Sequence, residues 1–151
     1  EYLFDSTFSG CSGLSGEIPA GLFQGISGTP LYGVFYRTFS GCSGLTGPIP
    51  ENLFAGIYGS PAGSMFYYSF FGCKKLTTIP DDLFGDISGT AKTGMFGGMF
   101  SGCTGLGGSS AKINGQYLYN IWPAATDNQI GDMYYNATGL DDYNAIPTLW
   151  K

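Results

Sequence analysis

Histidine is absent from the chain, and basic residues are few. Without histidine, the protein lacks the commonest general base and the commonest zinc ligand. Nucleic-acid binding needs a basic stripe that neutralises phosphates, whereas the six basic residues here are scattered and the net charge is −5. We therefore exclude nucleic acid as a partner, and anionic membrane surfaces are disfavoured for the same reason. The basic residues are Arg37, Lys74, Lys75, Lys92, Lys112 and Lys151.

Long apolar runs and a signal-peptide pattern are also missing. No stretch approaches the roughly 18 apolar residues of a membrane span, and the first residues show no basic, apolar, small-residue leader. The 151 residues fit one domain, and 43% hydrophobic residues are enough to bury a core. We interpret the start at Glu1, without a methionine, as a processed form or a fragment.

Each of the four cysteines stands in the same short frame. "FSGCSGL" occurs at residues 8–14 and again at 39–45, and the variants "FFGCKKL" and "FSGCTGL" occur at 70–76 and 100–106. The cysteines are separated by 31, 31 and 30 residues, and phenylalanines, leucines and an Ile-Pro dipeptide keep the same phase. A period of this length indicates tandem units that stack into a solenoid.

The spacing within one unit predicts its local structure. Phe35, Phe39, Cys42 and Leu45 are separated by 4, 3 and 3 residues, which predicts one face of a short helix. The following Leu-Thr-x-Ile-Pro segment has room only for a brief strand. Pro50 then suits the first position of a second short helix, because proline fits the start of a helix.

The run "MFYYSFFGCKKLTTIP" at residues 65–80, with its siblings, resembles the bacterial leucine-rich repeats of the BspA-like surface-protein type. The resemblance covers Tyr2 to about Leu106, and the unit here is longer by a "P-x-x-L-F-x-G-I-x-G" block. It implies a right-handed solenoid on a cell-surface or secreted protein that serves adhesion or protein binding. We therefore expect an α/β fold: a right-handed leucine-rich-repeat-like solenoid of about 31-residue units with short parallel strands and short helices.

The chain divides at Leu106 in this interpretation. Residues 1–106 hold about 3.5 tandem units, and residues 107–151 form a divergent C-terminal capping repeat of the same solenoid. We expect Trp122 and Trp150 to cover the last unit. With one deletion, Met133 to Pro147 aligns with Met65 to Pro80, and Ala137, Leu140 and Tyr143 then take the places of Phe70, Cys73 and Leu76.

The recurring cysteines predict burial rather than chemistry. We expect each thiol to be a small buried apolar group, stacked on the next as a ladder. Disulfides between Cys11 and Cys42 and between Cys73 and Cys103 are the alternative, which a secreted location permits. Metal binding is disfavoured because the sequence has neither histidine nor a C-x-x-C pair.

The carboxylates do not predict an active site. A glycosidase needs two carboxylates facing each other across a cleft, and we interpret Glu17, Glu51 and Asp81 as equivalent repeat positions. Asp81, Asp82 and Asp86, and separately Asp141 and Asp142, match no calcium-loop motif. We expect no enzyme, no cofactor, no metal and no catalytic residue.

Several tyrosines lie outside the inward-facing columns, and exposed tyrosines can anchor a partner. We predict an extracellular or cell-surface module that binds a protein or a glycan on another surface. The alternative hypotheses are a structural subunit that stacks end to end into a filament and a carbohydrate-binding stalk. The sequence does not name the partner. The predicted binding residues are Tyr32, Tyr36, Tyr58, Tyr67 and Tyr68.

Overall fold

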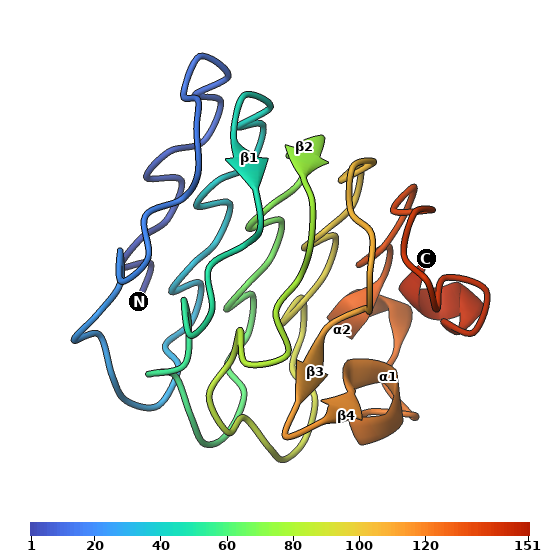
Figure 1. Ribbon diagram of the computed structural model, residues 1–151. Helices are drawn as coiled ribbons and strands as arrows, with labels where there is room; N and C mark the ends of the chain where they lie inside the picture. Colours follow the sequence, from blue (N-terminus) through green and yellow to red (C-terminus); the bar gives the residue numbers. More distant parts are fainter.

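The computed structural model describes residues 1–151, and the chain winds into layers that stand side by side (Figure 1). Each layer takes up about one sequence repeat, and backbone hydrogen bonds set its register against the next layer. The N-terminus belongs to the first layer and the C-terminus to the last, at opposite ends of the stack (Figure 1). We number the layers 1 to 5, as residues 1–31, 32–62, 63–92, 93–126 and 127–151.

Regular secondary structure is sparse in these layers. The parallel pair β1 (Thr46–Gly47) and β2 (Lys75–Leu76) joins layers 2 and 3, with Thr46 opposite Lys75. The antiparallel pair β3 (Lys112–Ile113) and β4 (Gln116–Tyr117) lies in layer 4. Three short helices follow: α1 (Leu118–Ile121), α2 (Asp127–Ile130) and the 3-10 helix η1 (Thr148–Trp150). None of these helices has the length and apolar character needed to cross a bilayer.

The predicted fold class, a right-handed leucine-rich-repeat-like solenoid with short helices and parallel strands, is wrong. The chain is about 7% helix and 12% strand, and its two sheets have two strands each without closing into a solenoid. The segment from Phe35 to Leu45, which we expected to be helical, is a run of consecutive turns, and so is the segment after Pro50.

The backbone explains why helical spacing produced turns instead of a helix. Every fourth residue of the segment has a positive φ: Gly33 at 62°, Arg37 at 51° and Gly41 at 74°. A right-handed helix excludes this conformation. Every second N–H group donates to a carbonyl three residues earlier and closes a turn within the layer. The remaining N–H groups donate to carbonyls of the next layer, as the Phe35 N–H does to the Met65 carbonyl at 2.9 Å. An α-helix would use all of these groups internally.

The core consists of aromatic columns that run across the layers. Neighbouring rings within two of the columns are near-parallel, with centroids 5.3 to 5.8 Å apart. A third column packs against both of them, as Phe54 does against Phe35 and Phe66 of one column and Phe70 of the other. Full burial of one such side chain stabilises the fold by about 1.5–3 kcal/mol. The columns are Phe4, Phe35, Phe66 and Phe96; Phe8, Phe39, Phe70, Phe100 and Tyr134; and Phe23, Phe54 and Phe84.

The cysteines form a ladder of free thiols. The Sγ atom of Cys42 donates to the Phe8 carbonyl at 3.0 Å, and those of Cys73 and Cys103 donate to the corresponding carbonyls of the preceding layers. The prediction of burial is confirmed for these three, whereas Cys11 in layer 1 is exposed. Burial raises the pKa of the Cys103 thiol to about 12. All four thiols are free, so the alternative disulfides do not form here.

The last copy of the motif is present, but three residues away from the predicted alignment. Tyr134 stacks on Phe100 with centroids 5.8 Å apart, so it continues the Phe70 column. Ala137 therefore occupies the cysteine position and Leu140 the position of Leu76. The predicted alignment was wrong because it matched Met133 with Met65, whereas the backbone of Met133 pairs with Phe100.

Candidate binding surface

Four of the five predicted tyrosines come together on one surface. Tyr36, Tyr67 and Tyr68, from layers 2 and 3, form a chain of ring contacts, and Tyr32 of layer 2 is linked to them through Tyr2 of layer 1. Tyr58 lies apart from them; it is 51% exposed and has no aromatic neighbour. We call the assembled surface the tyrosine face: Tyr2, Tyr32, Tyr36, Arg37, Tyr67, Tyr68 and Phe71.

The side chains of the tyrosine face hold one another in place. The rings of Tyr36 and Tyr67 are stacked, with centroids 5.3 Å apart and an interplanar angle of 12°. Tyr68 packs against Tyr67 with a centroid distance of 4.3 Å. The Arg37 guanidinium carbon lies 5.3 Å from the ring centre of Tyr36 and 5.5 Å from that of Tyr68. These are cation–π distances, so the arginine bridges the two tyrosines.

Three residues of the tyrosine face have an unfavourable backbone conformation. Arg37 has a φ of 51°, and Tyr2 and Tyr68 each have a φ of 53°. Layer 4 has Gly98, with a φ of 58°, at the position equivalent to Arg37 and Tyr68. Only glycine takes this conformation freely, and another residue there costs on the order of 1 kcal/mol. Burial also raises the pKa of the Tyr67 phenol to about 12, so its hydroxyl stays protonated even in mildly alkaline solution.

A pocket opens at the layer 4 end of the tyrosine face. Its volume is about 220 Å³, and Tyr67 and Tyr68 line one side of it. Three glycines of layer 4 line it as well, and residues in and around α2 supply the opposite side. We call it the tyrosine–aspartate pocket: Tyr67, Tyr68, Gly94, Gly97, Gly98, Asp127, Asn128, Gly131 and Asp132.

The polar side chains that line this pocket are accessible to a ligand. Asp127, Asn128 and Asp132 are all exposed. The single ion pair of the structure lies elsewhere, between Lys112 and Asp81 at 3.0 Å. No lysine or arginine lines the pocket, so its two carboxylates have no cationic partner there.

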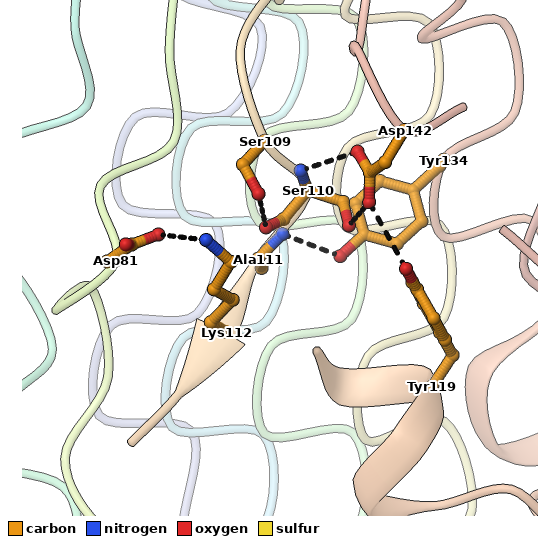
Figure 2. A network of polar contacts seen from close by, with 8 residues as sticks. All are labelled: Asp81, Ser109, Ser110, Ala111, Lys112, Tyr119, Tyr134 and Asp142. Atoms are coloured by element: carbon orange, nitrogen blue, oxygen red, sulfur yellow. Dashed lines mark hydrogen bonds and ion pairs between the residues drawn. The ribbon is translucent and has the colours of Figure 1, made fainter. Parts of the chain in front are cut away.

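A second polar cluster joins layers 4 and 5 and has a different character (Figure 2). The Asp142 carboxylate accepts hydrogen bonds from the Ser110 N–H at 2.9 Å, the Ser110 hydroxyl at 2.6 Å and the Tyr119 hydroxyl at 3.3 Å. The Ala111 N–H donates to the buried Tyr134 hydroxyl at 3.1 Å. These groups satisfy one another, so the cluster holds the C-terminal segment rather than presenting a site.

Two further cavities lie near the Ile-Pro segments. The larger, about 630 Å³, is an open groove across layers 1 to 3 that contains Glu17 and Glu51. These two were predicted to be equivalent positions, but the Ile-Pro phase places Ala20, and not Glu17, beside Glu51 and Asp81. An apolar cavity of about 310 Å³ lies in layers 1 and 2. No group of three or more cysteine, aspartate or glutamate side chains is arranged to hold a metal ion.

Sequence reasoning missed both edges of the surface. Tyr2 and Phe71 belong to the tyrosine face, and Asp127 and Asp132 belong to the adjoining pocket. Arg37 was missed as well, although the sequence contained a signal for it. Arg37 and Tyr68 are large residues at a repeat position that is glycine in layer 4. Asp127 gave no such signal. Asp132 occupies the same repeat position as Arg37 and Tyr68, but the predicted alignment, displaced by three residues, did not show this.

Comparison of the chain with protein-family models, with curated proteins and with solved structures found no match.

Proposed function

We propose that the protein is a non-enzymatic binding module of the extracellular or cell-surface type, used for adhesion or protein–protein binding. The tyrosine face is the observation that carries this proposal. The sequence repeats of the chain resemble those of the BspA-like surface-protein type, and this resemblance suggests the surface location. The tyrosine face adds a specific binding surface. Aromatic residues and arginine are the side chains most enriched at the energetic centres of interfaces, and the tyrosine face gathers both.

The backbone at Arg37 and Tyr68 supports a role in binding. Glycine at these positions would relieve the positive φ, as Gly98 does in layer 4. Large side chains are nevertheless present, and they cover the outer surface rather than the core. The positive φ itself belongs to the fold, because Ser6 and Asp132 adopt it at the same position in layers 1 and 5. Only layers 2 and 3 have a large side chain at this position, and there it lies on the tyrosine face.

Because glycine suits the positive φ at Arg37 and Tyr68, glycine substitutions there can test binding without disturbing the fold. The double variant Arg37→Gly and Tyr68→Gly removes both side chains and relieves both backbones, so its free energy of unfolding should stay within about 1 kcal/mol of the wild type. We expect at least tenfold weaker binding to a printed array of purified extracellular proteins and glycans, because two anchors are lost. Tyr58→Ala, an exposed tyrosine outside the tyrosine face, is the control and should bind normally. Equal binding by all three proteins, or no array member bound by the wild type, contradicts the proposal.

A structural subunit that stacks end to end is the second candidate, and layer 1 is the observation in its favour. Leu14 and Leu22 are exposed there beside the apolar cavity of about 310 Å³. Sedimentation velocity at rising protein concentration would show growing polymers if the ends associate, and Leu14→Glu should suppress them. A single monomeric species at all concentrations removes this candidate.

A further inference from the structure

We propose that the tyrosine–aspartate pocket binds one neutral sugar ring, with the ring against Tyr67 and Tyr68 and its hydroxyl groups on Asp127, Asn128 and Asp132. The inference rests on the proposed binding function, and it names the ligand class for one end of the tyrosine face.

The aromatic side of the pocket suits the apolar C–H face of a pyranose. The rings of Tyr67 and Tyr68 lie close over glycine backbone; a Cβ atom on Gly97 would come within 2.8 Å of the Tyr67 ring. The glycines therefore let the rings lie down across layer 4, and no layer 4 side chain competes for the space beside them. Large, rigid aromatic surface combined with a polar hydroxyl is typical of binding sites for amphipathic ligands.

The opposite side of the pocket suits hydroxyl groups. The carboxylates of Asp127 and Asp132 accept hydrogen bonds only, while the Asn128 amide both donates and accepts. A sugar ring offers several neighbouring hydroxyls, each of which can donate to a carboxylate oxygen in a charge-assisted bond. Burial raises the pKa of the Tyr67 hydroxyl to about 12, so the group stays neutral and can either donate or accept a hydrogen bond.

The charge of the pocket selects against acidic ligands. Two carboxylates without a neighbouring lysine or arginine repel phosphate, sulfate and uronic acids. Asp127 is the first residue of α2, and its carboxylate bends back toward Gly131 at the end of the helix, next to Asp132. The same two carboxylates attract cationic groups, so a lysine-containing peptide is the competing ligand in the test below.

The size of the pocket limits the ligand to one residue of a glycan. A volume of about 220 Å³ holds a single pyranose. Because a monosaccharide has few atoms with which to contact the protein, we expect weak binding, with a Kd on the order of 1 mM. A longer glycan can extend from the pocket over the rest of the tyrosine face and bind more tightly.

Nuclear magnetic resonance titration of the intact chain tests the inference directly. The probes are the neutral methyl pyranosides of glucose, galactose, mannose and N-acetylglucosamine. Each is added up to a concentration on the order of 20 mM, which is about 20 times the expected Kd. We expect at least one of them to shift the backbone amide signals of Gly94, Gly97 and Gly98 in a saturable way. Methyl glucuronide, which carries a carboxylate, should not shift them.

Two matched variants sharpen the test. Asp132→Asn keeps the shape and suits the positive φ of 56° at this position, so the fold should persist. Loss of a charged acceptor should weaken the bound pyranoside by about tenfold. Asp141→Asn removes the same charge from an exposed position outside the pocket and should leave the affinity unchanged.

The outcomes separate this inference from the proposed function. If no neutral pyranoside shifts the glycine signals, or if Asp132→Asn binds as tightly as the wild type, the sugar site is wrong. A lysine-containing peptide that binds the pocket in place of the pyranosides also overturns it. In each of these cases the Arg37→Gly and Tyr68→Gly test on the array still decides whether the tyrosine face is a binding surface.

Discussion

Layers 1 and 5 carry versions of the same motif, yet their burial is opposite. Phe8 and Leu14 of layer 1 are half-buried and exposed, while their counterparts Tyr134 and Leu140 of layer 5 are buried. The same difference holds at the cysteine position, where Cys11 is exposed and Ala137 is fully buried. The motif therefore specifies which side chains can enter the core, and the neighbouring layer decides whether they do.

The contrast arises from what covers each end. In layer 5 the Trp150 carbonyl accepts the Tyr134 N–H at 2.8 Å, and the Trp150 side chain is buried, with its ring edge-on to Tyr119 at a centroid distance of 6.4 Å. Trp122 extends the cover over layer 4 by packing on Phe96 and donating its indole N–H to the Gly89 carbonyl at 2.7 Å. Trp122 thus covers Phe96 of the fourth unit, as the sequence predicted. Layer 1 has no such cover: the carbonyls of Leu3, Asp5, Thr7 and Ser9 accept no hydrogen bond within the chain.

Thiol labelling should show the largest difference, between the open layer 1 and the covered layers 2 to 4. We expect Cys11 to react with a maleimide within minutes, and Cys42, Cys73 and Cys103 to react at least about 1,000-fold more slowly. The three buried thiols become accessible only when the fold opens, which costs about 5 kcal/mol or more. Mass spectrometry of labelled peptides over time measures the four rates.

The control for this experiment is labelling in denaturing urea, where the rates of all four thiols should become similar. Rapid modification of all four cysteines in the native protein would contradict both the burial of the ladder and the special position of Cys11.

Truncation of one aromatic column should affect its layers unequally. Phe70→Ala removes a fully buried ring between Phe39 and Phe100 and should lower the free energy of unfolding by about 3–5 kcal/mol. Phe8→Ala removes the half-buried ring at the open end, so we expect less than half of that loss. Urea denaturation followed by circular dichroism gives both values. Equal losses would mean that layer 1 is as well covered as layer 3.

Alkaline pH should lower the free energy of unfolding through the covered end, by less than the Phe70→Ala substitution does. Burial raises the pKa of Tyr119 to about 12, with the Asp142 carboxylate as the second cause, and burial also raises the pKa of Tyr134. Unfolded tyrosine loses its proton near pH 10, while these folded ones keep theirs, so the unfolded state binds fewer protons above pH 10. The free energy of unfolding should therefore fall as the pH rises from 10 to 12.

Tyr134→Phe isolates this effect within layer 5. At pH 7 the variant should be about 1 kcal/mol less stable, because the Ala111 N–H loses its acceptor. The deficit should shrink or reverse at pH 11, where the wild type is weakened by its buried phenol. Tyr58→Phe, at an exposed tyrosine, is the control. A deficit that does not change with pH would show that Tyr134 does not resist ionisation.

Part of the candidate site was predictable because it follows from the repeat. The tyrosines of layers 2 and 3 fall outside the inward columns, and the structure places four of them together on one surface. Tyr58 has the same sequence character but lies apart, since its segment belongs to another side of the layer. The pocket was not predictable, because the sequence alignment placed the motif of layer 5 three residues away from its position in the structure. The approach of Asp132 to Tyr68 also depends on how layers 3, 4 and 5 stack.

The sequence by itself determined the period of the chain and the identity of the core columns. Apolar side chains that recur every 31 residues can all be buried only if the units stack in register, so the burial of Phe35, Phe66 and Phe96 follows from their spacing. Only the tertiary structure decided between helix and turns, because a spacing of 4, 3 and 3 residues is compatible with both. The choice depends on where the backbone N–H groups find their acceptors, and here half of them find acceptors in the next layer, which no local stretch of sequence contains.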